Sequence, residues 1–358
     1  MESATTSYPE SPAGRDDWIR SRRPERQAVD PQRPYAYLVE RERTEGGELA
    51  NVATIFLTNR ECPWRCLMCD LWRNTLTESV PPGAIPAQID YALAELAVRR
   101  RPPGAGPEPI QRLKLYNSGS FFDPRAIPIA DYPAIAGRAR PFDQVIVECH
   151  PALVGDAALR FRDLLDGFTR ESQSSPQTHP PSDAALRRKS GARLEVAIGL
   201  ETVEPRVLDR LNKRMTLADF ARAARFLDEH GIALRAFVLV KPPFLDEAAG
   251  LEWAKRSIDF AFNEGAAVVS LIPTRSGNGA LDALAATGDF APPRLATLEA
   301  ALGYGVAQNR GRVFADEWDL EKFSTCALCF PARQDRLRRI NQRQELPPPV
   351  GCPICGGG

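Results

Sequence analysis

Three cysteines lie close together in the first quarter of the chain, at Cys62, Cys66 and Cys69. Their C-x3-C-x2-C spacing places three thiolates within one short loop. Structural zinc closes its shell with four protein ligands, and an ordinary [4Fe–4S] centre takes four thiolates, so three cysteines leave one metal position open. An open position is where a substrate or cofactor binds, and the spacing therefore predicts a reactive metal centre.

Two other interpretations of this loop stay open. Cys149, at the end of an expected strand, would complete a closed site if it supplied a fourth ligand. Alternatively, the three cysteines would be unrelated buried thiols or a zinc site. The position of the triplet, directly after the expected strand 52–58, favours the open centre.

Four more cysteines form two C-x2-C pairs near the end of the sequence, Cys326 with Cys329 and Cys352 with Cys355. Spacing of this kind is typical of a zinc ribbon, so tetrahedral zinc is the first expectation. An auxiliary iron–sulfur cluster on the same four thiolates, or free thiols, are the alternatives. The arginine-rich run 333–343 between the pairs would contact phosphate, or would form a solvated helix face.

Apolar runs of strand length alternate with stretches of helical spacing from Asn51 onward. This alternation is typical of a parallel sheet covered by helices, in which chemistry gathers in the loops after the carboxyl ends of the strands. The expected strands are 52–58, 112–117, 144–149, 193–199, 232–239 and 267–272, and the expected helices are 85–100, 128–139, 155–170, 216–230, 247–264 and 292–307. The sequence therefore predicts an α/β fold, a partial or complete (β/α) barrel.

The barrel is expected over residues 51–307 of the 358. Residues 1–50, rich in Arg, Pro and acidic residues, are interpreted as an N-terminal extension that wraps the surface or stays disordered. A small C-terminal four-cysteine module is expected over 308–358, and 171–190, rich in Ser and Pro, is expected to be a surface insertion.

The overall composition predicts a cytoplasmic protein. Lys and Arg number 46, as do Asp and Glu, so no long-range field draws the molecule towards nucleic acid or anionic lipid. The chain has neither an apolar run long enough to span a membrane nor a secretory leader at its start. Clustered cysteines in a cytosolic protein indicate metal rather than disulfides.

The cysteine loop after the first barrel strand resembles that of the radical S-adenosylmethionine (radical SAM) superfamily, over roughly residues 51–275. The resemblance implies a barrel of radical SAM type, in which SAM chelates the open iron of a [4Fe–4S] cluster. Reduction by a donor such as ferredoxin or flavodoxin then cleaves SAM to a 5′-deoxyadenosyl radical, which abstracts hydrogen from the substrate. Met68, where the superfamily usually has an aromatic residue, would pack against adenine.

Segments 115–124, 199–202 with 211–213, 240–245 and 271–274 are similar to the archaeosine-biosynthesis radical SAM proteins, of the branch shared with the Elongator catalytic subunit. The resemblance implies that a loop of small residues after the second strand holds the amino group of SAM, and that Glu201 accepts hydrogen bonds from its amino or ribose groups. A salt-bridged structural role for Glu201 stays open. The loop residues are Asn117, Ser118, Gly119 and Ser120.

Two basic residues are candidate catalytic groups. Lys241 ends the fifth expected strand ahead of two prolines, so its ammonium is expected to point into the barrel mouth, where it would bind carboxylate or phosphate or pair with Glu201. His150 is expected to titrate near neutrality and to position substrate or SAM, or to be structural.

These expectations together describe a radical SAM enzyme, a lyase or transferase, that modifies a nucleobase in tRNA. The archaeosine-type reaction releases a side chain from a lysine-bearing deazaguanine base, in complex with a separate transferase subunit. Two rivals stay open. One is radical chemistry on a small molecule or peptide, and the other is a non-catalytic metal-bearing RNA adaptor.

Overall fold

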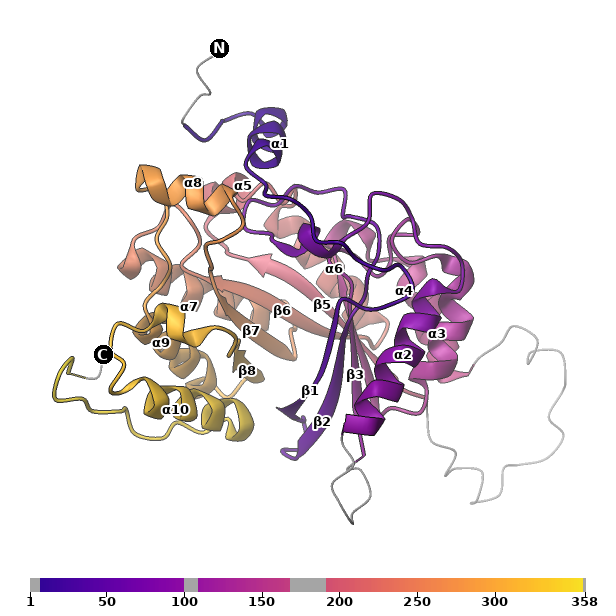
Figure 1. Ribbon diagram of the computed structural model, residues 1–358. Coiled ribbons are helices and arrows are strands. Elements are labelled where there is room, and N and C mark those ends of the chain that lie inside the picture. Colours follow the sequence, from indigo (N-terminus) through magenta and orange to yellow (C-terminus); the bar gives the residue numbers. More distant parts are fainter. Residues whose placement is uncertain (1–6, 100–108, 168–190, 357–358) are drawn as a thin grey trace, which may run out of the picture.

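Eight strands form one sheet whose order in space follows the order in sequence (Figure 1). The computed structural model describes residues 7–99, 109–167 and 191–356. Strand β1 is antiparallel to β2, and every later neighbouring pair is parallel. The strands are β1 (Ala36–Arg43), β2 (Leu49–Phe56), β3 (Arg112–Tyr116), β4 (Gln144–Cys149), β5 (Arg193–Glu201), β6 (Ala233–Val240), β7 (Val268–Pro273) and β8 (Arg312–Ala315).

The sheet curls into an open barrel. Glu42 on β1 accepts a 2.6 Å hydrogen bond from Arg235 on β6, five strands away in the sheet order. In a flat sheet, strands five places apart would be separated by about 24 Å. Their side chains meet because the inner faces of the two halves of the sheet turn towards each other. The predicted partial (β/α) barrel is confirmed.

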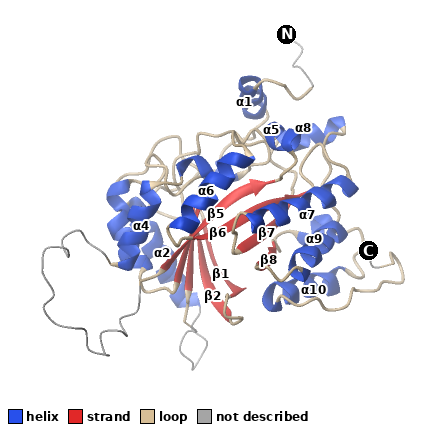
Figure 2. Cartoon of the chain, turned by 180° about the vertical axis from the view of Figure 1, so that it is seen from behind, coloured by secondary structure: helices blue, strands red, loops and turns tan. Residues whose placement is uncertain are grey.

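Helices cover the outer face of the sheet, so that the parallel strands are buried on both sides (Figure 2). The α-helices are α1 (Pro12–Ser21), α2 (Ala84–Arg99), α3 (Tyr132–Ala139), α4 (Asp156–Asp166), α5 (Pro205–Arg210), α6 (Leu217–Glu229), α7 (Glu247–Asn263), α8 (Ala280–Thr287), α9 (Leu295–Ala307) and α10 (Phe330–Arg343). Short 3-10 helices span Leu71–Asn74, Ile129–Asp131, Pro151–Leu153 and Leu320–Phe323.

Local sequence signals explain where several of these helices begin and end. The Thr216 side chain accepts from the N–H of Asp219, whose carboxylate accepts from the N–H of Thr216, and this reciprocal cap starts α6. Gly167, with φ of 83°, ends α4 in the left-handed conformation that glycine adopts without strain. All six expected barrel strands and all six expected helices are present; β4 has the expected bounds, and each of the others has at least one shifted end.

The two ends of the chain join the barrel, which the sequence-based division did not predict. Residues 36–43 of the expected extension form β1, and residues 312–315 of the expected C-terminal module form β8. Helix α1, also within 1–50, packs against Leu67 of the cysteine loop and against α8. The expected insertion 171–190 lies outside the described residues.

A network of buried charges fills the lumen beneath the carboxyl ends of the strands. Lys114 on β3 donates to Glu40 at 2.7 Å and to Glu42 at 2.6 Å, and Arg235 donates to both Glu42 and Glu195. Burial alone would raise the pKa of Glu42, but the positive charges of Arg235 and Lys114 lower it. The lumen is therefore ionic as well as apolar.

Among the described helices, none has both the length and the apolar composition needed to cross a lipid bilayer.

Candidate active site and metal centre

The three-cysteine loop and the inner face of the barrel line one cavity of about 710 Å³, a size ordinary for a small-molecule site. The loop follows β2, and Cys62, Cys66 and Cys69 all lie on the cavity wall, with Met68 beside them. Met68 also packs against apolar side chains from the β5–α5 and β6–β7 regions. The loop therefore stands at the carboxyl ends of the strands, as predicted.

Burial raises the pKa of each of these three thiols to about 12, and the charge of a neighbouring cysteine adds to the effect in each case. Without a bound cation the thiols are thus protonated at neutral pH. A metal or cluster needs thiolates, so its binding must release these protons.

The loop of small residues after β3 closes on the cysteine loop. A Cβ built on Gly119 would stand 3.2 Å from the Cβ of Cys62, so only glycine permits this approach without a shift. Ser118, with φ of 54°, lines the cavity, and Ser120 Oγ accepts from the N–H of His150 at 2.7 Å. Asn117 is fully buried, and neither atom of its amide has a hydrogen-bond partner among the described residues.

These features fit a group bound at the cysteine loop. Unpaired buried amides are rare in folded proteins, but Asn117 is not among the residues that line the cavity, so its amide does not by itself indicate a ligand there. Gly119 leaves room at Cys62 that any other residue would fill. The residues present therefore suit an iron–sulfur cluster with a polar cofactor beside it.

Glu148 on β4 is a cavity residue that the sequence did not single out. Its carboxylate accepts from the N–H of Asn117 at 2.6 Å, and the N–H groups of Ser118 and Gly119 also stabilise its charge. Burial outweighs these hydrogen bonds and raises the pKa of Glu148 to about 7. The backbone donors of the Asn117–Ser120 loop thus face a carboxylate of the protein itself.

Glu201 and Lys213 form a buried ion pair in the cavity wall. Glu201 ends β5 with φ of 64°, at a bulge in the pairing with β6. A Cβ on Gly199 would lie 2.0 Å from both Glu201 Oε1 and Lys213 Nζ, so the pair occupies the space that this glycine leaves. Burial alone would lower the pKa of Lys213, but the negative charge of Glu201 raises it. The ammonium therefore stays charged near the cysteine loop.

His150 supports the cysteine loop rather than titrating near neutrality. Its ring stacks on Trp64 with centroids 3.7 Å apart, Nε2 lies 3.0 Å from the carbonyl of Lys213, and Nδ1 accepts from the N–H of Ala152. Burial, then the charge of Lys213, lower the pKa of His150 to about 4. The expected neutral-range titration is wrong, because desolvation favours the uncharged ring.

Lys241 does not point where the sequence predicted. Its Nζ donates to the carbonyl of Ala291 and lies 3.8 Å from Glu247, and it is not among the residues that line the cavity. The alternative pairing with Glu201 is made by Lys213 instead. The left-handed backbone at Lys241, with φ of 52°, turns the side chain towards the loop before α9.

Above the ionic floor, aromatic side chains line the cavity. The ring of Tyr116 lies between those of Phe56 and Phe237, with centroid distances of 6.1 and 6.0 Å respectively. Trp318 packs on Phe56, at one end of this row, with a centroid distance of 5.5 Å. Trp318 is 52% exposed. The cavity therefore has three levels: thiols and small polar residues at the top, aromatic rings in the middle and paired charges below.

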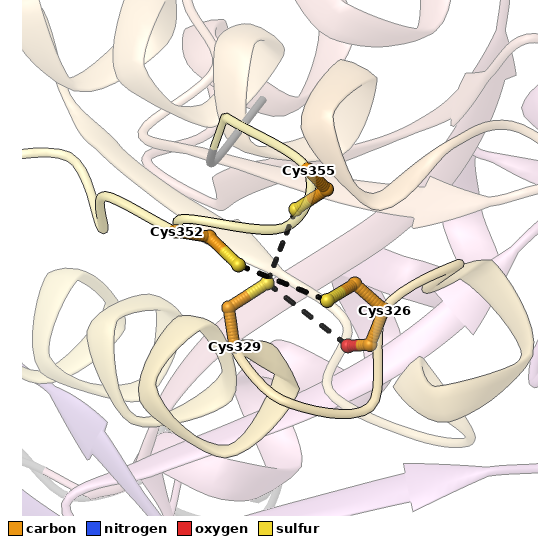
Figure 3. Close-up of side chains that lie close together, drawn as sticks. All are labelled: Cys326, Cys329, Cys352 and Cys355. Carbon is orange, nitrogen blue, oxygen red and sulfur yellow. Dashed lines mark hydrogen bonds between the residues drawn. The ribbon is translucent and has the colours of Figure 1, made fainter.

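The four C-terminal cysteines converge on one point, as Figure 3 shows. Cys326 Sγ lies 3.8 Å from Cys352 Sγ, Cys329 Sγ lies 3.6 Å from Cys355 Sγ, and all four sulfurs are within 4.8 Å of one another. Among the described residues, they are the group of potential ligands that gathers tightly enough to hold a single metal ion.

The arginine run between these pairs lies on α10, and acidic neighbours engage most of it. Arg333 is buried and donates to Glu299 at 2.5 Å, and Arg338 lies 3.3 Å from Glu317. Arg339 pairs with Asp335 on the same helix at 2.7 Å. Part of the run is therefore structural rather than a uniform phosphate-binding surface.

No family model matches the sequence. The chain is 25% identical over 255 residues to archaeosine synthase subunit beta of Methanosarcina acetivorans, which covers 70% of this chain and 65% of that protein. It is 48% identical over 65 residues to archaeosine synthase subunit beta of Thermococcus kodakarensis, covering 18% of this chain and 20% of that one. The chain thus matches less than two thirds of the length of these relatives.

Among solved structures, Elp3 of Methanocaldococcus infernus, truncated at its N-terminus, is similar with a TM-score of 0.46 and 12% identity, over 72% of this chain and 59% of that one. The predicted likeness to the radical SAM superfamily is confirmed. Within that superfamily, the narrower likeness to the archaeosine-synthase proteins is confirmed as well.

Proposed function

We propose that this chain is a radical SAM enzyme, in which Cys62, Cys66 and Cys69 hold a [4Fe–4S] cluster and SAM binds beside it in the cavity. The observation that carries the proposal is the placement of three thiols from one loop on the wall of a single cavity, at the carboxyl ends of the parallel strands. Bound there, the cluster and SAM would supply a 5′-deoxyadenosyl radical.

The residues of this chain would bind and orient the cofactor. In the proposal, Ser118 and Gly119, which line the cavity next to Cys62, receive the polar end of SAM. Glu201, held in place by Lys213, offers a carboxylate to its amino or ribose groups. Met68 packs against the adenine. Neither Lys241 nor His150 is assigned a catalytic step.

The substrate proposed is a nucleobase in tRNA, modified by archaeosine-type lyase chemistry together with a separate transferase subunit. The relatives named archaeosine synthase subunit beta support this choice. The aromatic level of the cavity also suits a planar base that has left its stack. One observation favours a small-molecule or peptide substrate instead, because most of the arginine run is engaged in ion pairs.

We further propose zinc at the four C-terminal cysteines. A tetrahedral zinc with four thiolates holds its sulfurs about 3.8 Å apart. The Sγ–Sγ separations of 3.8 Å between Cys326 and Cys352 and 3.6 Å between Cys329 and Cys355 agree with a single ion. An auxiliary four-iron cluster would bind each thiolate through a different iron and would spread the sulfurs further.

The decisive experiment is anaerobic reconstitution with iron and sulfide, followed by dithionite and SAM. We expect 5′-deoxyadenosine and methionine in equal amounts, and loss of both the cluster absorbance and the product in Cys62→Ala, Cys66→Ala and Cys69→Ala. Cys149→Ala is the matched control, since that thiol donates to the His150 carbonyl and is expected to be dispensable for the cluster. A cluster that Cys149→Ala abolishes would show a closed four-cysteine site and overturn the proposal.

Binding to transfer RNA separates the substrate classes. The variant to use is Arg338→Gln with Arg339→Gln and Arg343→Gln, because these three side chains are exposed whereas Arg333 is buried against Glu299. We expect weaker tRNA binding at physiological salt in the triple variant. Product formation without any tRNA affinity would favour a small-molecule or peptide substrate, and tRNA binding without SAM cleavage would indicate an RNA adaptor.

A further inference from the structure

Helix α10 lies across the open side of the barrel, between β8 and β1, and contacts both strands (Figure 1). Pairing between β1 and β8 does not occur in the described sheet, which ends at these two strands. Arg338, Asn341 and Gln342 of α10 line the same cavity as the three-cysteine loop. The helix is therefore a wall of the candidate active site.

Two amide side chains, from Asn341 of α10 and from Gln344 directly after its end, take the place of a ninth strand along the free edge of β8. Asn341 accepts from the N–H of Ala315 at 2.9 Å and donates to its carbonyl at 2.8 Å. Gln344 makes the same two bonds with Val313, at 2.7 and 2.8 Å. Val313 and Ala315 are alternate residues, so their backbone groups point to the same side of the strand. The two amides thus satisfy the edge of the sheet and fix α10 in one register.

The start of α10 is attached to the four-cysteine site. Cys329 directly precedes the first residue of the helix, and Cys352 and Cys355 come from the segment that returns along it. Arg336 Nε donates to the carbonyls of Pro347 and Pro348 at 3.1 and 3.0 Å, and so joins this returning segment to the helix. Four thiolates without a cation would repel one another, so a bound ion stabilises the arrangement.

We propose that a metal ion on the four C-terminal cysteines holds α10 against β8 and thereby builds one wall of the reaction cavity. The C-terminal module then has a role in forming the substrate site, in addition to its own stability. The inference rests on the proposed function only in naming the cavity as the reaction site. Its structural part, metal-dependent docking of α10, concerns residues that neither bind the cluster nor contact SAM.

The docking has a direct local reporter. The N–H groups of Val313 and Ala315 donate to the side chains of Gln344 and Asn341, at the end of α10, rather than to another strand. Their hydrogen exchange therefore measures the docked helix, whereas the amides of β4 and β5, deep in the sheet, measure the integrity of the barrel.

The experiment compares full-length protein, stripped of metal by a chelator, before and after addition of Zn²⁺. We expect zinc to slow exchange at Val313 and Ala315 by about tenfold or more and to leave β4 and β5 unchanged. Cys355→Ser should remove the zinc-dependent protection, and Gln344→Leu should remove it at Val313 while zinc still binds. Arg339→Gln, on the exposed face of the same helix, is the matched control and should behave as wild type.

Equal protection of Val313 and Ala315 with and without zinc would show that α10 docks independently and would overturn the inference. Protection lost everywhere in the stripped protein would overturn it too, because the metal would then support the whole fold rather than the helix. Failure of the proposed function is a separate result, seen as absent 5′-deoxyadenosine, and it leaves the exchange measurement unaffected.

Discussion

Single residues at the carboxyl ends of the strands carry unusual backbone conformations. Ser118, Glu201 and Lys241, which follow or end β3, β5 and β6, all have positive φ. Such conformations cost about 1–3 kcal/mol for a residue with a side chain and persist where the surrounding structure requires them. Ser118 and Glu201 line the cavity, whereas Lys241 turns away from it. Two of the three strained residues, Ser118 and Glu201, therefore lie at the carboxyl ends of the strands, where the candidate site is located.

Replacement of Gly199 tests how tightly the ion pair of Glu201 and Lys213 is packed. Gly199→Ala would place a methyl group 2.0 Å from both charged atoms, so both of them must move. We expect a loss of about 1–3 kcal/mol in the free energy of unfolding, together with weaker SAM binding by calorimetry. Gly303→Ala, in α9 with nothing within 4 Å of the new atom, is the control and should be neutral or stabilising. Equal effects from both substitutions would contradict the steric argument.

Glu148 should make stability depend on pH. Its pKa is raised from 4.5 to about 7 in the folded protein, so between these values the folded chain keeps a proton that the unfolded chain has released. The stabilisation from protonated Glu148 is complete below pH 4.5 and is lost as pH rises to about 7. Relative to Glu148→Gln, the wild type should lose about 1–3 kcal/mol of unfolding free energy across this window, measured by urea denaturation. A difference independent of pH would show that Glu148 is ionised throughout.

Sequence reasoning found the residues whose chemistry is visible in their spacing and missed those defined by contacts through space. The three cysteines and Ser118, Gly119 and Glu201 do line one cavity. Glu148 and Lys213 were not singled out, because a lone charged residue in a strand or loop gives no sign of its burial. Lys241 was predicted to point into the cavity and does not. The two prolines after it indicated a fixed loop, but they did not indicate the direction of the lysine side chain.

At the scale of secondary-structure elements, the missed strands are those that break the apolar pattern. Strand β1 reads AYLVERER, and its inward-facing Glu40 and Glu42 look like surface residues in the sequence. They face the lumen because Lys114 and Arg235, from strands distant in sequence, neutralise them. Strand β8 has only four residues. The core strands were predictable because apolar residues dominate them even though Lys114, Glu195 and Arg235 face the lumen. Strand β1 was not, because the partners of its two glutamates are identified only by the fold.

The lumen network should be fragile to the loss of one member. Arg235 is fully buried and paired with both Glu42 and Glu195. Arg235→Met would leave Glu195 without an ion-pair partner among the described residues and Glu42 with Lys114 alone, and we expect destabilisation of about 3–5 kcal/mol. Arg256→Met removes an exposed ion pair with Glu252 on α7 and should change stability by less than about 0.5 kcal/mol. Comparable denaturation midpoints for the two variants would show that the lumen charges are solvated.

At the scale of the whole molecule, both ends of the chain converge on the site that the middle of the chain builds. The C-terminal helix closes the side of the barrel, and the N-terminal segment covers the cysteine loop. Arg23 lies 2.7 Å from Glu61, the residue before Cys62, and Arg26 pairs with the same carboxylate. The segment described by its sequence as an extension is thus part of the support of the candidate cluster site.

Helix α1 should therefore protect the cluster. Trp18 is buried beside Tyr8 and Leu67, and Leu67 stands between the second and third cysteines in sequence. Trp18→Ala would leave a cavity above the loop, costing about 3–5 kcal/mol of local packing and admitting solvent and oxygen. We expect the reconstituted cluster of this variant to bleach several-fold faster in air, while its initial iron content matches wild type.

Arg20→Gln is the matched control, because Arg20 lies on the exposed face of the same helix and pairs only with Asp17 in the described structure. Its cluster should decay at the wild-type rate. If Trp18→Ala and wild type bleach equally while denaturation confirms that the variant has lost stability, oxygen reaches the cluster by another route. The side of the barrel that α10 covers would then be the candidate path, and undocking of that helix in the metal-free protein would be expected to speed the bleaching further.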